Sequence, residues 1–335
     1  MAEPLKATFF TLQHRDRAVL LPATLVLLVG LVVMIGAFAA INWGMISRMF
    51  ALLQQFPGGP EVLTEADGMA MFQGMMLMFL SMILLLFPMY LLIAAYEAAC
   101  LRWMIRGEVK GFAGFALDHD TWRVYGVYWC WYILQFLVSF AASIIMMPVI
   151  FMTMPGLVTG DGAIDHEQMW RWQLSVQLPL SLVQYIPLLF FGVRFAPSAA
   201  VSIARRRFSF LEAWPVTRGR FWALLGSFAL LMLINGAAMA LVMGAAYWVL
   251  FSAMLTQWFA DGWPMSGGFP DVTDQQIAQL MQQVFRPQTF MVLGALYAAL
   301  LLITLVYTLL SYGVNARAAL VALEEGKIEQ LPPTD

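Results

Sequence analysis

The sequence carries little charge for its length. Only 11% of its 335 residues are Asp, Glu, Lys or Arg, whereas 61% are hydrophobic. A soluble domain has about 25% charged residues, so this composition excludes an ordinary soluble protein and indicates an integral membrane protein. The net charge of −2 gives no bulk attraction to nucleic acid, and we expect no nucleic-acid partner.

Cysteine and histidine are also scarce. Cys100 and Cys130 stand far apart, in neither a CxxC motif nor a zinc-binding spacing, and the three histidines fall in connections between apolar stretches. The sequence contains no HExxH, GxSxG or Walker motif, and the apolar stretches hold no carboxylate pair suited to catalysis. We therefore expect a protein that is not an enzyme and that has no metal or cofactor.

Long apolar runs dominate the chain. A helix that crosses a bilayer needs about 20 apolar residues. The run near the N-terminus far exceeds the roughly 7–15 residues of a signal-peptide core, so it predicts a retained transmembrane helix. Six runs are long enough to span a membrane: 18–43, 70–96, 124–154, 174–203, 220–257 and 289–314. The prediction is an all-α integral membrane protein with six transmembrane helices.

The charges between these runs predict the orientation. Fourteen Lys and Arg residues lie on the side of the termini and of the second and fourth connections. The other side has three, against nine acids. Since cytoplasmic loops carry the Lys/Arg excess, both termini are predicted to be cytoplasmic, in a multi-pass protein of the bacterial inner membrane.

The chain also has an internal repeat. The second, fourth and sixth runs end in Tyr96–Ala99, Pro197–Ala200 and Ala316–Ala319. Thr64 and Asp165, candidate N-caps after outer loops together with Thr273, are separated by 101 residues, as are the alanines at 98 and 199. This period predicts one polytopic domain of three helix-hairpin repeats, with approximate units 1–106, 107–207 and 208–328, and a short polar tail over 329–335.

Each repeat is predicted to contain a short amphipathic helix on the cytoplasmic side. The candidate segments are 5–12, 111–117 and 208–214. In the third, Ser209 and Glu212 fit a capping box, and Gly219 is suited to ending the turn that follows. Such helices lie in the membrane interface or serve as linkers packed on the bundle, and the pattern leaves both alternatives open.

Arg194 is the most conspicuous charge within an apolar run. A helix that enters the membrane near Leu174 has spanned it just before Arg194, so the side chain can reach the headgroups. The alternative is a polar interaction inside the bundle, with Glu97 as the candidate partner at a similar depth. Pro179, Pro187 and Pro197 also predict bends in this fourth helix.

The most cationic stretch of the chain follows the fourth helix. We interpret its arginines as candidates for binding lipid headgroups at the inner face. They are Arg205, Arg206, Arg207, Arg218 and Arg220.

The same stretch carries a family resemblance. The run from Arg194-Phe-Ala-Pro through Phe208-Ser-Phe-Leu-Glu-Ala-Trp214 to Thr217-Arg-Gly-Arg-Phe-Trp222 resembles the membrane domain of some glycerophosphoryl diester phosphodiesterases and related bacterial membrane proteins. The resemblance implies a cytoplasmic-membrane protein concerned with lipids or the envelope. It does not extend to phosphodiesterase activity, because His14-Arg15 is followed by Asp16 rather than by the Gly of the enzyme's His-Arg-Gly motif.

Two functions fit these observations. The leading hypothesis is a non-enzymatic envelope component that acts through membrane lipids, a protein partner or a second copy of itself at its basic inner face. The alternative is a transporter of a small solute or lipid that uses the Pro-bent fourth helix and Arg194. A polar cavity deep in the membrane would favour transport.

Overall fold

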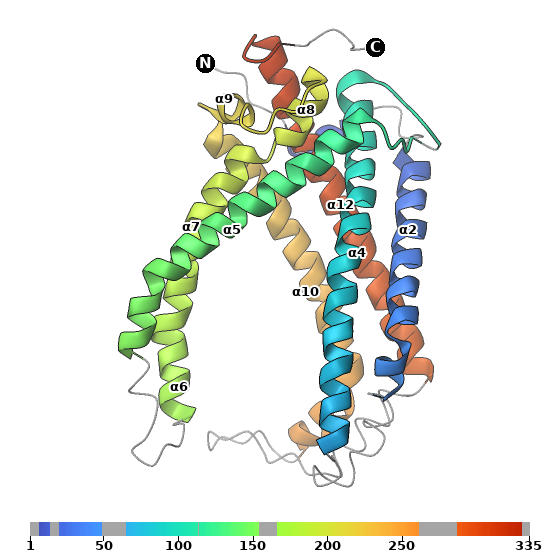
Figure 1. Cartoon of the computed structure of the whole chain (residues 1–335), viewed down its shortest axis with the longest axis vertical. Helices are drawn as coiled ribbons and strands as arrows, with labels where there is room; N and C mark the ends of the chain where they lie inside the picture. Colours follow the sequence, from blue (N-terminus) through green and yellow to red (C-terminus); the bar gives the residue numbers. More distant parts are fainter. Residues whose placement is uncertain are drawn as a thin grey trace. The chain divides into compact units, whose positions relative to one another are not determined.

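The computed structural model describes residues 7–13, 20–48, 65–112, 114–153, 166–260 and 287–329 (Figure 1). These residues form helices and connecting turns, and no strand. The helices are α1 (Phe10–Gln13), α2 (Leu20–Ile41), α4 (Glu65–Arg106), α5 (His119–Thr153), α6 (His166–Trp172), a π-helix (Gln173–Gln177), α7 (Leu178–Phe195), α8 (Ser198–Arg205), α9 (Ala213–Thr217), α10 (Phe221–Ala260) and α12 (Pro287–Glu324).

Six of the helical stretches are long and apolar enough to cross a membrane, which confirms the predicted all-α membrane fold. In five of these stretches, at most 6% of the most apolar 18-residue segment is buried within the protein. In the fourth stretch, Met169–Arg205, 44% of that segment is buried. Backbone hydrogen bonds within each helix satisfy the peptide groups, so these apolar surfaces can face lipid without exposing unpaired backbone. Their side chains are suited to hydrocarbon rather than to water.

The chain divides into two compact units, which we describe separately. Unit 2 consists of Leu27–Met89 and Phe228–Ser311. Within it, α2 and α4 meet where the buried Asn42 amide donates to the Ser81 hydroxyl at 2.8 Å. Gly74 allows close packing nearby, because a Cβ there would overlap the Met45 side chain. A polar pair and a small residue are the contacts that hold helices together in lipid.

Unit 1 consists of Met1–Val26, Tyr90–Ser227 and Tyr312–Asp335 and contains most of the buried residues. Its core includes alanine-rich segments of α4, α8 and α12, with Ala98, Ala200 and Ala319 fully buried. Small side chains let helix backbones approach closely. The Ala-Ala motifs therefore mark the packed core of unit 1.

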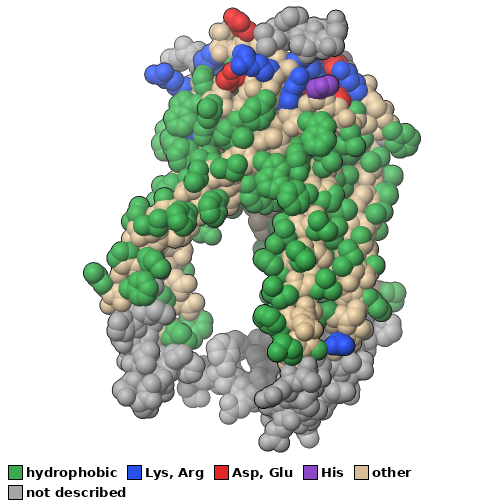
Figure 2. All heavy atoms as spheres, in the orientation of Figure 1, with side chains coloured by type: hydrophobic (Ala, Val, Ile, Leu, Met, Phe, Trp, Pro, Cys, Tyr) green, Lys and Arg blue, Asp and Glu red, His purple; other side chains and the backbone are tan. Residues whose placement is uncertain are grey.

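Charged side chains gather at one end of unit 1, where α4 and α8 end and α5 begins (Figure 2). We name this the charged end; it carries 102–123 and 205–220. The sequence placed Arg102 and Arg106 in a connection, but both lie in the last two turns of α4. The prediction was wrong because the apolar run stops near 96 while the helix continues through small and buried residues. At α12 the helix likewise runs to Glu324, beyond the predicted end at 314.

The fourth predicted helix is interrupted in two places. A π-helix precedes α7, and Ala196 and Pro197 separate α7 from α8. Pro197 has no N–H to continue the hydrogen bonds of α7, but its carbonyl accepts from Val201 at 2.8 Å and so begins α8. Pro187 is accommodated within α7.

The short helices at the charged end differ from the prediction. In the described part of the first segment, 7–12, the helix covers Phe10 to Leu12 as part of α1, and 111–117 contains no helix in its described residues. Gly111 and Gly114 adopt φ of 77° and 86°, values that end a helix rather than extend it. The residues predicted as helix N-caps, Thr64, Asp165 and Thr273, lie outside the described residues, although α4 and α6 begin directly after the first two.

The predicted capping box is also wrong. Helix α9 begins at Ala213, and within the described residues no side chain caps it by a hydrogen bond. Glu212 instead pairs with Arg205, which takes its carboxylate away from the backbone. The prediction for Gly219 is confirmed, since α9 ends at Thr217 and Gly219 has a φ of 82°.

Candidate functional site

The arginine-rich stretch begins where α8 ends. Arg206 has a left-handed φ of 55°, and the Arg206 and Arg207 N–H groups donate to the carbonyls of Ile203 and Ser202, each at 3.2 Å. This pattern satisfies the last carbonyls of the helix and reverses the chain. Arg207 is thereby left on the surface as the first residue of an extended segment.

Two buried serines of α8 hold this extended segment in place. The Ser198 hydroxyl lies 2.6 Å from the Phe195 carbonyl and 3.1 Å from the Phe210 carbonyl and shares its one proton between them, and the Ser209 N–H donates to the Ser202 hydroxyl at 3.0 Å. The Phe210 ring stacks on Phe195 of α7, with centroids 4.7 Å apart. The segment therefore has a fixed path across α8, and so does the backbone of Arg207 at its start.

Three of the five predicted headgroup-binding arginines are neutralised by acids. Arg205 pairs with Glu212 and Arg220 pairs with Glu325. Arg206 pairs with Glu108 at 2.7 Å, which joins the end of α8 to the segment after α4. These arginines tie the elements of the charged end to one another.

The other two arginines, Arg207 and Arg218, are exposed and have no ion-pair partner within the described part of the chain. Large apolar side chains lie beside them in the sequence and are exposed as well: Phe208 next to Arg207, and Trp222 four residues after Arg218. Exposed cations beside exposed aromatic rings are typical of a membrane interface. These two guanidinium groups are free to bind an anion.

A second group of charges was not recognised as a site from the sequence. Arg102 of α4 has no exposed surface, and its Nη1 donates to both carboxylate oxygens of Asp118 at 2.6 Å. Its Nη2 donates to the Gly114 carbonyl at 3.3 Å. Asp118 also accepts from the Thr121 N–H at 3.2 Å and so caps α5. One carboxylate thus joins the end of α4 to the beginning of α5.

Asp120 extends this network. It pairs with Arg106 and, at 2.7 Å, with Arg123. A polar pocket of 270 Å³ lies here, lined by Arg106, Lys110, Asp118, His119, Asp120, Arg123 and Arg206. Most of its charges are satisfied by each other, so the network primarily fixes the geometry of the charged end.

Arg194 lies in an aromatic cage. Its guanidinium carbon is 5.4 Å from the ring centroid of Phe190, 5.0 Å from that of Trp214 and 5.1 Å from that of Phe221. Its Nη1 donates to the Thr217 hydroxyl at 3.4 Å. A cation over each of these aromatic faces is stabilised by about 0.5–2 kcal/mol, depending on desolvation. Arg194 therefore joins α7, α9 and the beginning of α10.

Glu97, the other intramembrane candidate, has different partners. It is buried in α4 and accepts a hydrogen bond from the Tyr128 hydroxyl of α5. Within the described residues no ion pair joins Glu97 to Arg194. Glu97 thus contacts the Tyr128 hydroxyl, whereas Arg194 lies in its aromatic cage.

Two of the acids that neutralise the arginines, Glu212 and Glu325, are held in their charged form. Burial alone would raise the pKa of Glu212, but the neighbouring Ser209 hydroxyl, the contact with Arg205 and the charges of Arg205 and Arg207 outweigh it and lower that pKa. A hydrogen bond from Lys327 and the nearby Arg220 likewise lower the pKa of Glu325. Both ion pairs are therefore intact at neutral pH.

The described residues contain no group of three or more His, Cys, Asp or Glu side chains arranged to hold a metal ion. The residues suited to binding are cations, and the group they would bind is an anion. Arg207 and Arg218 are the free cations of the predicted set, and Arg205, Arg206 and Arg220 position the surrounding segments. No protein-family model, curated protein or solved structure matches this chain.

Proposed function

We propose that the protein is a non-enzymatic component of the bacterial cytoplasmic membrane that binds anionic lipid headgroups at its charged end. The observation that carries the proposal is that Arg207 and Arg218 are exposed and have no ion-pair partner among the described residues, with Arg207 at the start of a hydrogen-bonded segment. A Lys or Arg near an anionic membrane surface contributes about 1 kcal/mol. Two such residues are enough to select anionic over zwitterionic lipid.

The proposed orientation places the charged end and both termini in the cytoplasm. This follows from the Lys/Arg excess on that side of the apolar runs. The cytoplasmic leaflet is the anionic one, so the same orientation brings Arg207 and Arg218 to the lipids they would bind. The resemblance to the membrane domain of glycerophosphoryl diester phosphodiesterases agrees with a role concerned with lipids.

Thermal unfolding of the full chain in neutral detergent tests this function. Phosphatidylglycerol should raise the unfolding temperature more than phosphatidylcholine does, because a ligand that binds the folded state stabilises it. Replacing both arginines (Arg207→Gln with Arg218→Gln) should weaken phosphatidylglycerol binding roughly 30-fold, the equivalent of about 2 kcal/mol.

Arg48→Gln is the matched control, because Arg48 is also an exposed arginine at the end of an apolar helix but lies in unit 2. It should keep the full response to phosphatidylglycerol. An unchanged response in the double variant would contradict the proposal, as would an equal loss in the control.

One observation favours the alternative function, transport. A groove of 440 Å³ between α5 and α7 is lined by Ser143, Gln177, Ser181 and Gln184 in addition to apolar side chains. It lies within stretches that can span a membrane and adjoins the π-helix; π-helical turns are frequent at functional sites. Arg194 does not line it. Solute flux in proteoliposomes that is abolished by Gln184→Leu would support transport, and absence of flux would reject it.

A further inference from the structure

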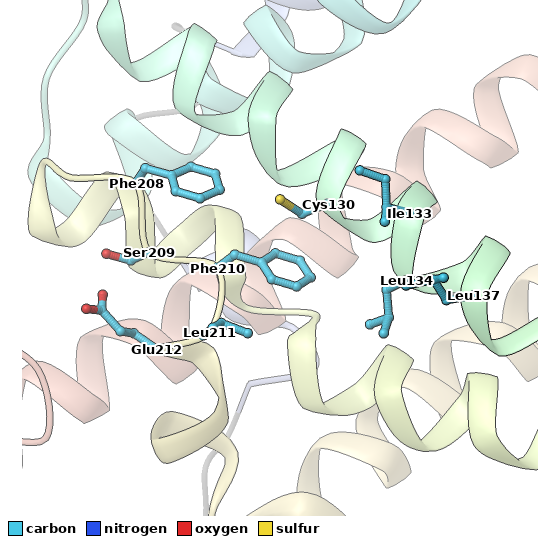
Figure 3. A pocket seen from close by; sticks show the side chains of 9 residues that line it. All are labelled: Cys130, Ile133, Leu134, Leu137, Phe208, Ser209, Phe210, Leu211 and Glu212. Carbon is cyan, nitrogen blue, oxygen red and sulfur yellow. The ribbon is translucent and has the colours of Figure 1, made fainter.

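An apolar groove of 490 Å³ lies in unit 1 between α5 and the extended segment that follows Arg207 (Figure 3). Helix α5 contributes Ile133, Leu134 and Leu137 along one wall, together with the Cys130 thiol. Ile133 and Leu137 are both more than half exposed. The volume is within the range of about 300–1,000 Å³ that is typical of sites for small molecules.

The opposite wall is amphipathic. Figure 3 shows the Phe208 and Phe210 rings directed toward α5, while the Ser209 and Glu212 side chains lie on the other side of the segment. This alternation is expected of an extended chain, in which successive side chains point to opposite sides. Gly126 of α5 gives the Phe208 ring room, because a Cβ there would lie 3.2 Å from it. The groove therefore has an apolar floor and a polar rim.

The rim has an excess of positive charge. Arg205 and Glu212 form an ion pair and neutralise each other, which leaves the exposed Arg207, adjacent to Phe208 in the chain, without an acid of its own in the described residues. Arg207 directly precedes Phe208, which lines the groove, so its backbone lies at the rim. An occupant of this groove would need an apolar part along α5 and an anionic part at Arg207.

We propose that the groove binds one anionic phospholipid, with an acyl chain along Ile133, Leu134 and Leu137 and the phosphate at Arg207. The inference rests on the proposed function and adds a specific site to it. A purely apolar occupant, such as a neutral lipid or a transmembrane helix, would leave Arg207 without a counter-charge. An anionic lipid matches both parts of the site.

The Cys130 thiol provides a direct probe of occupancy. The full chain is reconstituted in vesicles of phosphatidylcholine alone or with added phosphatidylglycerol, and the modification of Cys130 by the uncharged reagent N-ethylmaleimide is followed by peptide mass spectrometry. Cys100, which is 1% exposed, is the internal reference. At lipid levels roughly ten times Kd, occupancy should slow the reaction of Cys130 roughly tenfold, whereas phosphatidylcholine alone should not.

Two kinds of variant separate the headgroup from the chain. Arg207→Gln should abolish the slowing by phosphatidylglycerol, and Arg48→Gln, which changes an exposed arginine of unit 2, is the control and should retain it. Leu137→Trp, at an exposed wall position, should fill the groove and reduce retention of phosphatidylglycerol while Arg207 is intact. Leu134→Trp is the second variant if the first does not fold, as judged by size-exclusion chromatography.

Each of the remaining outcomes would contradict the proposal that the groove binds an anionic phospholipid. Equal protection of Cys130 by both lipids would show an occupant not selected by charge. Full retention of phosphatidylglycerol in the Trp variant would show binding at the arginines without an acyl chain in the groove, and the proposed function would still stand. If the protein without substitutions showed no preference for phosphatidylglycerol over phosphatidylcholine, the proposed function would be rejected as well.

Discussion

Asp118 offers the sharpest test of how the charged end is held together. In the Asp118→Ala variant, the guanidinium of Arg102 keeps the Gly114 carbonyl at 3.3 Å and Asp120 at 3.9 Å as its remaining partners, while its side chain has no exposed surface. The same change removes the acceptor for the Thr121 N–H and with it the cap of α5. Two stabilising contributions are therefore lost together.

Their magnitudes can be worked out separately. Breaking a buried ion pair costs about 3–5 kcal/mol. Asp118 itself is 29% exposed and Asp120 lies nearby, so the low end of this range applies. Loss of an N-cap costs about 1 kcal/mol. Asp118→Ala should lower the free energy of unfolding by about 4 kcal/mol, a large part of the 5–15 kcal/mol that is typical of a folded protein.

Asp118→Asn separates the two contributions, because Asn caps a helix about as well as Asp does but carries no charge. It should cost clearly less than Asp118→Ala. Arg317→Ala, which removes an exposed pair with Glu324 at 3.3 Å, is the surface control and should cost about 0–1 kcal/mol. Denaturant-induced unfolding of the full chain in mixed micelles measures all three. Equal stability of Asp118→Ala and the unsubstituted protein would show that Asp118 does not hold the ends of α4 and α5 together.

Three other changes have defined outcomes. Gly313→Ala should lower stability by about 1–3 kcal/mol, because a Cβ would overlap the Thr11 hydroxyl; an unchanged unfolding midpoint would show that α1 does not pack there. Arg194→Met should cost about 1–2 kcal/mol by removing the cation from its aromatic cage, and thermal unfolding that matches the unmodified protein would argue against the cage. The pKa of Glu212 is lower in the folded protein than in the unfolded chain, where it is about 4.3. The pair with Arg205 therefore contributes its full stabilisation at pH values above about 4.3, and this contribution is lost as the pH falls through the folded-state pKa. Since Glu212 is 36% exposed, the effect is at most about 1 kcal/mol, and Glu212→Gln should remove it from the pH dependence of unfolding.

The membrane-spanning part of the fold was predictable from the sequence. A bilayer requires apolar runs of a defined length, and α2, α5 and α10 match the predicted runs to within about five residues. The same reasoning misplaced the ends of α4 and α12. Hydropathy falls where these helices leave the hydrocarbon, but helix formation continues through small residues such as Ala98 and Ala319, which pack in unit 1.

The network around Arg102 was only partly visible in the sequence. Asp118 directly before an apolar run is a helix-start signal, so the beginning of α5 could have been placed there. Its pairing with Arg102, 16 residues earlier, depends on the path of the connecting segment. That path is set by Gly111 and Gly114 in left-handed conformations, which sequence spacing does not reveal.

The surroundings of Arg194 were even harder to predict from the sequence. Phe190 stands four residues earlier and is an expected neighbour on a helix. Trp214 and Phe221 belong to other elements and reach Arg194 only because the turns around α9 bring them there. The sequence pointed to a charged partner because an acid is the usual counterpart of an arginine. Three aromatic faces and a hydroxyl group take that role.

Native mass spectrometry of the gently purified full chain tests directly whether Arg207 and Arg218 bind anionic lipid. It reads the lipids that remain bound and compares the unmodified protein with the Arg207→Gln, Arg218→Gln double variant and with Arg48→Gln. We predict that the unmodified protein and the Arg48 variant retain phosphatidylglycerol in preference to phosphatidylcholine, and that the double variant retains neither preferentially. Equal retention of both lipids by the unmodified protein would contradict the account.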